Sequence, residues 1–220
     1  MNRVRRPKDP SELSAAEWVR QQLIDDIVAG RLRPDEKLSE VRIADRLGCS
    51  RTPVREAFRH LGALGLIHFE KNRGGKVVKL ERRSMLELYQ ALAEIAAACA
   101  GLAAQQPETL RHVHLAEIRL PVASPAGTGD EQDLFRALVR AAGNSLLTDV
   151  AQSIRCRLLP YWRLLEKAAD DWARMGAEAQ AKVVAAVQAG DGRAARRLTR
   201  AYVLMARDLT LKVLPPSALP

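Results

Sequence analysis

The 220-residue sequence is poor in the residue types on which several kinds of function depend. Phe, Trp and Tyr make up only 4% of it, and there are just three cysteines and four histidines. Cys49, Cys99 and Cys156 are far apart, odd in number and in no metal-binding spacing. This argues against a disulfide framework or a zinc site and favours a reducing compartment. Few aromatics with abundant alanine and leucine favour packed helices over a β-sandwich.

Other absences narrow the location and the class of protein. No apolar run approaches the ~18–20 residues that span a bilayer. The opening stretch, MNRVRRPKDP, is basic but lacks the apolar segment of a signal peptide. The sequence shows no catalytic triad, no phosphate-binding loop and no plausible pair of nucleophile and base. We therefore expect a cytoplasmic protein that is not an enzyme and has no membrane partner.

Positive charge is plentiful but unevenly placed. The formal net charge is +9, and residues 1–83 carry 19 Lys and Arg against 12 Asp and Glu. The basic excess is therefore mainly a property of the N-terminal part. It indicates an anionic partner, of which nucleic acid is the most common.

The N-terminal part predicts a short series of helices followed by a hairpin. Apolar periodicity predicts a first helix over 14–29, and after a Pro-marked turn and a short extended piece a second over 39–47. A third begins with Thr52 as N-cap and Pro53 in the first helical position. Strands at 66–70 and 76–80 flank the glycine-rich turn KNRGG. This order is typical of a winged helix-turn-helix.

The third helix has an apolar back and a cationic front. The apolar positions follow the spacing i, i+3, i+4, i+7 and are Val54, Ala57, Phe58 and Leu61. Arg51, Arg55 and Arg59 recur every four residues on the other side, and arginine can bond guanine through two N–H groups or clamp a phosphate. As an alternative, these arginines are solvated charges, partly neutralised by Glu36 and Glu56. Their position in a helix-turn-helix of a basic region favours DNA.

The stretch LSEVRIADRLGCSRTPVREAFRHLGALGLIHFEKNRGGKVV resembles the GntR family of bacterial transcription regulators. The resemblance covers about residues 12–80 and implies DNA binding. Where many members have an arginine early in the second helix, this chain has Val41, with Arg42 next to it. The DNA-contacting positions that we infer from the resemblance and from the helix face are Ser50, Arg51, Thr52, Arg55, Arg59, Arg42 and, in the wing, Lys71, Arg73 and Gly74.

The remainder predicts a bundle of six or seven helices. The candidate segments are 84–106, 108–119, 130–142, 146–167, 171–189 and 192–213. Pro160 is expected to kink the fourth of these. The segments LELYQALAEIAAACAGLAA, LFRALVRAAGN and VVAAVQAGDGRAARRL are similar to the ligand-sensing FCD domain of the FadR branch of the family. The fold class is therefore mainly α.

The FCD resemblance also shows what this chain lacks. Most members of that branch hold a divalent metal with one Asp and three His. The matching positions here are Gln132, Arg136, Gln180 and Tyr202, so we expect no metal cofactor and assign these four to an effector pocket. Asp133 lies one residue away from the first position. The only histidines of this half, His112 and His114, are spaced to point to different sides of a helix, and the family's Arg and Glu on the first helix are replaced by Leu92 and Ala96.

The predicted organisation has five parts. Residues 1–11 form a flexible basic arm, 12–80 the winged helix-turn-helix, and 81–84 a linker. Residues 85–213 form the helical effector-binding and dimerisation domain, and 214–220 a tail. We expect a homodimer that binds a palindromic DNA operator, more often as a repressor than as an activator.

Two readings of the helical domain remain open. In the first it senses a small anionic effector, such as an organic acid, without a metal, and Arg136 pairs with the anion directly. In the second the pocket is filled by side chains, and the protein is a constitutive DNA-binding dimer.

Overall fold

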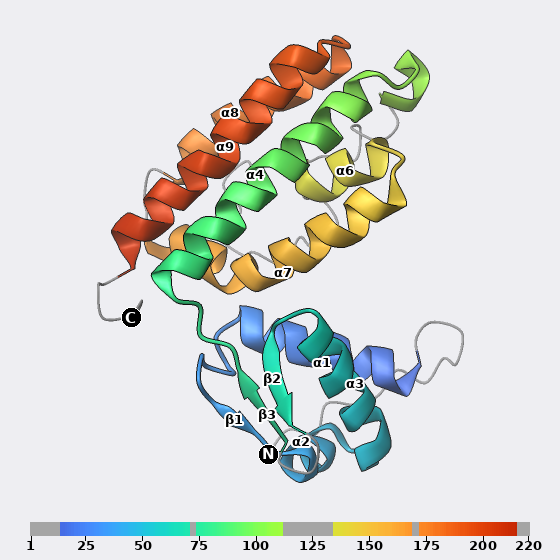
Figure 1. Cartoon of the computed structure of the whole chain (residues 1–220), viewed down its shortest axis with the longest axis vertical. Helices are drawn as coiled ribbons and strands as arrows, with labels where there is room; N and C mark the ends of the chain where they lie inside the picture. The colour runs from blue at the N-terminus through green and yellow to red at the C-terminus, as the bar shows by residue number, and fades with distance from the viewer. Residues whose placement is uncertain (1–13, 71–73, 112–133, 169–171, 215–220) are drawn as a thin grey trace. The chain divides into compact units, whose positions relative to one another are not determined.

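The computed structural model describes residues 14–70, 74–111, 134–168 and 172–214. The chain divides into two compact units, Met1–Leu80 and Glu81–Pro220, which are described separately below (Figure 1). Several predictions lie outside the described residues: the basic arm, the wing-tip residues Lys71 and Arg73, both histidines of the second half, Gln132, Asp133 and most of the tail.

The first unit has the predicted order of a winged helix-turn-helix (Figure 1). Its three strands form an antiparallel sheet in the order β1-β3-β2, in which Leu38 pairs with Gly75 and Phe69 with Gly75 from the other side. The elements are α1 (Ala15–Val28), β1 (Lys37–Leu38), α2 (Glu40–Leu47), α3 (Arg51–Ala63), β2 (Ile67–Glu70) and β3 (Gly74–Val77).

Local capping explains where the first two helices begin and where the second ends. Ser14 Oγ accepts a hydrogen bond from the Glu17 backbone N–H at 3.2 Å, and the Glu17 carboxylate accepts one from the Ser14 N–H at 2.8 Å. Ser39 caps α2 as predicted, since its hydroxyl accepts from the Arg42 N–H. Gly48 ends α2 with a φ of 66°, which a residue with a Cβ adopts only at a cost.

The apolar stripes of α1 and α3 form the core of this unit. All four residues of the predicted α3 stripe are fully buried, and so are Val19 and Leu23 of α1. Phe58 meets Phe69 of β2 edge to face, with ring centroids 6.0 Å apart. This packing fixes α3 against the rest of the unit, so that its opposite face is held outward.

Two boundaries differ from the prediction. α3 begins at Arg51 with Ser50 as N-cap, so Thr52 and Pro53 lie inside the first turn. Proline is tolerated there because the first N–H groups of a helix have no acceptor within it. β3 covers Gly74–Val77 rather than residues 76–80. Gly74 therefore belongs to the sheet, where a Cβ would collide with the carbonyl oxygen of Leu38.

The second unit is helical throughout the described residues. Its elements are α4 (Arg82–Ala104), α6 (Leu134–Ala141), α7 (Ser145–Ala168), α8 (Trp172–Gln188) and α9 (Gly192–Val213). The expected linker at 81–84 is wrong for its last three residues, because α4 begins at Arg82. Only the first residues of the helix expected over 108–119 are described, and 108–111 are helical. α7 continues through Pro160.

α4 is the central helix of the second unit and packs against α6, α7, α8 and α9 (Figure 1). It is also long and apolar enough to cross a membrane by length and composition, which the sequence reading overlooked. Its burial fits a core helix equally well: Leu92 and Ala96 are 0% and 2% exposed. Burial also raises the pKa of the Cys99 thiol above its ordinary value.

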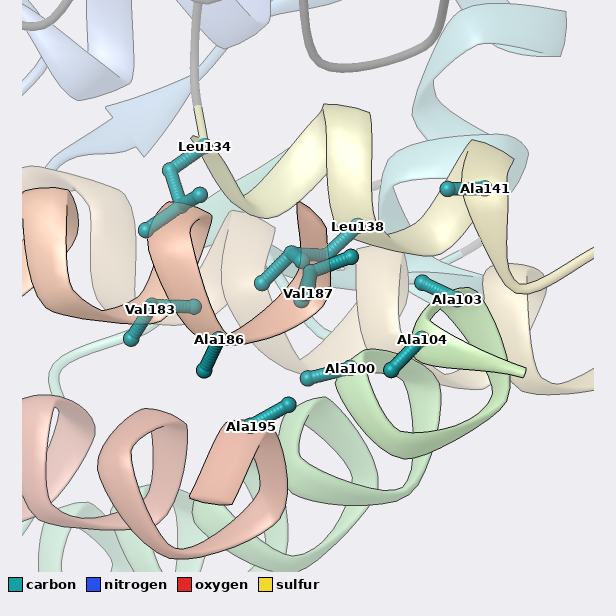
Figure 2. Close-up of a cluster of buried hydrophobic side chains, with 10 residues drawn as sticks. All are labelled: Ala100, Ala103, Ala104, Leu134, Leu138, Ala141, Val183, Ala186, Val187 and Ala195. Carbon is teal, nitrogen blue, oxygen red and sulfur yellow. The ribbon is translucent and has the colours of Figure 1, made fainter. Parts of the chain in front are cut away.

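Small side chains fill one part of this unit, between α4, α6, α8 and α9 (Figure 2). Three alanines of α4 and Ala195 of α9 meet larger residues from α6 and α8. Alanines allow the helix backbones to approach closely, so the space between the four helices is occupied by apolar atoms. The cluster consists of Ala100, Ala103, Ala104, Leu134, Leu138, Ala141, Val183, Ala186, Val187 and Ala195.

Candidate DNA-binding edge and interior of the helical unit

The outward side of α3 carries the arginines that the sequence singled out. Arg51 and Arg59 are exposed, and the side chain of Arg55 is 39% exposed. Ser50 and Thr52, at the start of the same helix, are also exposed. The structure therefore brings the five α3 candidates onto one accessible helix edge, and the first turn adds backbone N–H groups that suit a phosphate.

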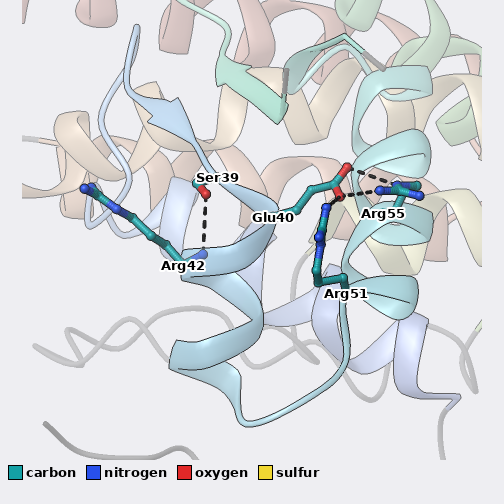
Figure 3. A network of polar contacts seen from close by, with 5 residues as sticks. All are labelled: Ser39, Glu40, Arg42, Arg51 and Arg55. Atoms are coloured by element: carbon teal, nitrogen blue, oxygen red, sulfur yellow. Dashed lines mark hydrogen bonds and ion pairs between the residues drawn. The ribbon is translucent and has the colours of Figure 1, made fainter. Parts of the chain in front are cut away.

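A buried carboxylate lies behind this edge. Glu40, the first residue of α2, has a side chain that is only 7% exposed and points at two arginines of α3 (Figure 3). Arg55 donates to it twice, from Nε to Oε1 at 3.2 Å and from Nη2 to Oε2 at 2.9 Å. Arg51 Nη2 lies 3.7 Å from the same Oε2. The hydrogen bonds from Arg55, followed by its charge and that of Arg51, hold the pKa of Glu40 below its ordinary value.

The sequence reading missed Glu40 and named two other acidic residues as neutralising groups. The Glu36 carboxylate instead accepts a hydrogen bond from the Arg33 backbone N–H at 2.9 Å, and Glu56 is exposed. A carboxylate at the first position of α2 was a usable signal, because α2 and α3 of a helix-turn-helix must pack together. Its 15-residue separation from Arg55 hid it from local spacing rules.

Arg42 and Gly74, the other two DNA-binding candidates within the described residues, are not gathered with Arg51 and Arg55. Arg42 is exposed on α2, but its side chain extends away from Glu40 and the α3 arginines (Figure 3). Val41, at the position where the family resemblance implied an arginine, is 48% exposed. Gly74 is buried in β3, so close packing against β1 explains this glycine without any contact to DNA.

Two of the four predicted effector positions lie together in the helical unit. Gln180 of α8 donates from Nε2 to Tyr202 Oη of α9 at 2.8 Å. Trp172 stacks on the Tyr202 ring, with centroids 5.9 Å apart and the planes 17° from parallel. Arg136 is half-buried on α6, and Gln132 lies outside the described residues. The pair of α8 and α9 thus offers neutral hydrogen-bonding groups beside an aromatic face.

A second polar group inside this unit was not identified from the sequence. Arg155 of α7 is 7% exposed. Its guanidinium carbon lies 5.3 Å from the ring centroid of Phe135 and 5.9 Å from that of Trp162. The signal was available, since Arg155 occupies an inward position of the apolar period formed by Ala151, Leu158 and Leu165. An arginine on an otherwise inward stripe is a functional candidate.

Tyr89 extends the polar interior to α9. It is fully buried, and its hydroxyl lies 2.8 Å from Thr210 Oγ1, which itself donates to the Ala206 carbonyl at 2.7 Å. Tyr89 therefore donates to Thr210. Burial raises the pKa of Tyr89 above its ordinary value, so the phenol stays protonated and keeps this hydrogen bond.

Metal-ligating side chains do not cluster in the part of the chain that the structure describes. No group of three or more His, Cys, Asp or Glu side chains is placed there to hold an ion. The three cysteines are free thiols, Cys99 buried and the other two half-buried.

These features define a winged helix-turn-helix DNA-binding unit joined to a helical unit with a polar interior. Residues 15–77 match the model of the gntR family of bacterial regulatory proteins, and residues 87–204 match that of the FCD domain. The chain belongs to the GntR family of bacterial transcription regulators and carries an FCD domain.

Individual relatives agree with this assignment. A probable repressor of a D-xylose utilization operon from Paenarthrobacter nicotinovorans is 30% identical over 81% of this chain and 80% of its own length. The repressor GlaR of Escherichia coli K12 is 28% identical over 42% of the chain and 40% of its own length.

Solved structures confirm the fold. Escherichia coli McbR/YncC superposes with a TM-score of 0.72 at 21% identity, over 91% of this chain and 98% of that protein. A putative GntR regulator from Rhodococcus sp. RHA1 superposes with a TM-score of 0.69 at 26% identity, over 92% and 100%. The protein is therefore a transcription regulator and not an enzyme, as its sequence indicated.

Proposed function

We propose that the protein is a homodimeric repressor that reads its operator with the outward edge of α3. The observation that carries this is the arrangement of that helix: an apolar face fully buried in the unit and an opposite edge of exposed arginines. A helix of this kind fits the major groove, where arginine discriminates guanine. Arg51 and Arg55 are the base-reading candidates, and Ser50, Thr52 and Arg59 suit phosphates.

The wing and α2 complete the proposed contact surface. Lys71 and Arg73 of the wing and Arg42 of α2 are assigned to the DNA backbone. Two-fold symmetry of a dimer would place two α3 helices on two half-sites of a palindrome about one helical turn apart. Such a protein acts in the cytoplasm, where the DNA is.

The test of the DNA-reading edge is a gel-shift titration. A duplex is first selected from random sequence by the wild-type protein, and light scattering establishes the oligomeric state. Arg51→Ala and Arg55→Ala should each weaken binding by about 1–3 kcal/mol. Arg197→Ala, which removes an exposed arginine of α9, is the matched control for the lost charge. Unchanged affinity of both α3 variants would refute the assignment.

We further propose that the helical unit binds a small organic anion without a metal. Arg155 supports this, because a buried guanidinium between aromatic rings can hold a carboxylate through two parallel hydrogen bonds. Gln180 and Tyr202, with Gln132 and Arg136 from the sequence reading, would contribute further polar contacts. An effector bound there acts on DNA binding only if it prefers one arrangement of the dimer to another.

Thermal unfolding against a panel of organic acids and acyl-CoA anions tests this second step. A ligand at 100 times its Kd should stabilise the folded protein by about 2.7 kcal/mol. Arg155→Met should abolish the shift while DNA binding persists, and Arg197→Met should preserve both. Elemental analysis of the purified protein should find no stoichiometric zinc, nickel or manganese, and one metal ion per chain would refute a metal-free pocket.

The alternative function, a constitutive DNA-binding dimer, is favoured by a different observation. The alanine-rich cluster between α4, α6, α8 and α9 fills that part of the helical unit with apolar side chains (Figure 2). A domain filled in this way would contribute dimerisation and no sensing. Absence of stabilisation by every anion in the panel would favour this function over ligand sensing.

A further inference from the structure

Glu40 is an acidic group in a place where acidity opposes DNA binding. It lies among the arginines of the α3 edge, and phosphate repels its charge. Its side chain is 7% exposed, so it is not an incidental surface carboxylate. It forms two hydrogen bonds to Arg55 and an ion pair with Arg51 (Figure 3). A group that weakens general attraction to DNA, yet contacts both base-reading candidates, requires an explanation.

We propose that Glu40 is a positioning residue that orients Arg55 for base readout and so raises specificity at the expense of general DNA affinity. This inference rests on the proposed function of the α3 edge. It concerns a residue that does not itself contact the base, and it predicts opposite changes in operator and nonspecific binding.

The geometry leaves Arg55 able to read a base while it is held. A guanidinium has five N–H donors, and Glu40 takes two, one from Nε and one from Nη2. Three remain: both on Nη1 and the second on Nη2. One Nη1 donor and the remaining Nη2 donor form the outer fork of the group, which matches the O6 and N7 acceptors of guanine. The Arg55 side chain is 39% exposed, so part of it is accessible to a ligand.

An arginine that is already held in one orientation loses less conformational entropy when it binds DNA. A free arginine explores many rotamers and loses that freedom when it contacts a base, whereas a clamped one has already lost it on folding. Glu40 is itself held, because it is the first residue of α2 and follows the Ser39 cap. Orientation is thus transmitted from the α2 backbone through one carboxylate to the α3 side chain.

The two hydrogen bonds between Glu40 and Arg55, here called the clamp, also keep this cation from binding any nearby phosphate. An arginine that can swing freely reaches any nearby phosphate and contributes the same affinity on every sequence. The same arginine turned edge-on to the groove contributes mainly where guanine is present. Arg42, which points away from Glu40, has no such restraint from it (Figure 3).

The test compares Glu40→Gln with Glu56→Gln in the full-length protein. Both remove one negative charge near the α3 edge, but Glu56 is exposed and outside the clamp. The probes are the duplex selected by the wild type and a poly(dA-dT) duplex of equal length, which lacks the O6 and N7 acceptor pair of guanine. For Glu40→Gln, operator affinity should fall by about tenfold, the loss of one guanine contact, while poly(dA-dT) binding rises and its salt dependence steepens. Glu56→Gln should raise binding to both duplexes alike.

Two further variants make the result decisive. Glu40→Asp keeps the charge but withdraws it by one methylene, so it should lower operator affinity without raising poly(dA-dT) binding. In an Arg55→Ala background, Glu40→Gln should cause no further loss of operator affinity, because the clamped group is absent. Circular dichroism melts report whether each variant is folded, and Glu40→Asp carries the test if Glu40→Gln is not.

Each outcome supports or overturns the inference. Equal losses of operator and poly(dA-dT) binding by both Glu40 variants would show a merely structural role. An operator affinity that rises with Glu40→Gln as it does with Glu56→Gln would show a simple charge effect. A full further loss in the Arg55→Ala background would show that Glu40 acts elsewhere. If Arg55→Ala and Arg51→Ala both leave operator binding unchanged, the proposed DNA-reading edge itself fails, and the positioning role with it.

Discussion

The two units of this chain carry their arginines in opposite ways. In the first, Arg51 and Arg55 stand at an exposed edge, and a buried carboxylate restrains them from behind. In the second, Arg155 lies inside the domain between aromatic rings. The first arrangement suits a polyanion that approaches from outside, and the second suits a small anion that must be enclosed. We therefore propose different partners for the same residue type, according to its burial and neighbours.

The largest effect should come from breaking the core that presents the α3 edge. Phe58→Ala removes a fully buried ring that contacts Phe69 and should destabilise the first unit by about 3–5 kcal/mol. Binding to every DNA sequence should be lost. Denaturant unfolding followed by circular dichroism should show one early transition with the helical unit still folded. A single, unshifted transition with normal DNA binding would contradict the packing described here.

A smaller loss of stability is expected from Gly74→Ala. The new Cβ would meet the Leu38 carbonyl oxygen, at a residue whose φ is 88°. We expect destabilisation of about 1–3 kcal/mol. Because the substitution disturbs the packing of the sheet, operator and nonspecific DNA binding should weaken by the same factor. A stable variant that loses only DNA affinity would instead assign this glycine to the DNA contact inferred from the family resemblance.

In the helical unit, Tyr89→Phe should have a modest effect. It removes a buried hydrogen bond to Thr210, whose own hydroxyl proton remains bonded to the Ala206 carbonyl. One polar partner is lost and one lone pair is left unsatisfied, so the free energy of unfolding should fall by about 1 kcal/mol. Chemical denaturation measures this. No change in DNA affinity is expected, which contrasts with the two substitutions in the first unit.

The smallest effect is a pH dependence from the Glu40 clamp. The folded pKa of Glu40 is below its unfolded value near 4.5, so the clamp stabilises the folded state above that pH. The contribution is lost as the pH falls through the folded pKa. Unfolding of wild type and Glu40→Gln between pH 6 and about 3 should therefore converge toward acid. Curves that stay parallel throughout would contradict a charge-dependent clamp.

Sequence reasoning succeeded where function follows local spacing. The buried stripe of α3, the Ser39 cap and the order of helices and strands were all predicted, because each depends on residues within a turn or two of one another. The start of α3 was misplaced by two residues, since both Ser50 and Thr52 are good N-caps.

It failed where function depends on contacts between distant segments. Glu40 was overlooked because its partner Arg55 lies on another helix, and the close approach of Gly74 to Leu38 was not foreseen because the two residues are far apart in sequence. In the helical unit, Arg155 was missed because the sequence of this unit is rich in alanine and leucine. The prediction relied instead on the positions at which the family's metal ligands are missing. Gln180 and Tyr202 do lie together, although their role in binding an effector stays a prediction.

One measurement addresses the central claim, that the exposed edge of α3 reads bases. Each guanine of the selected duplex is replaced in turn by 7-deazaguanine, which lacks the N7 acceptor, and binding is compared for wild type and Arg55→Ala. The account predicts one guanine per half-site at which the wild type loses about tenfold in affinity while Arg55→Ala loses nothing further. If Arg55→Ala remains as sensitive as the wild type at every guanine, Arg55 does not read the groove, and the account is wrong.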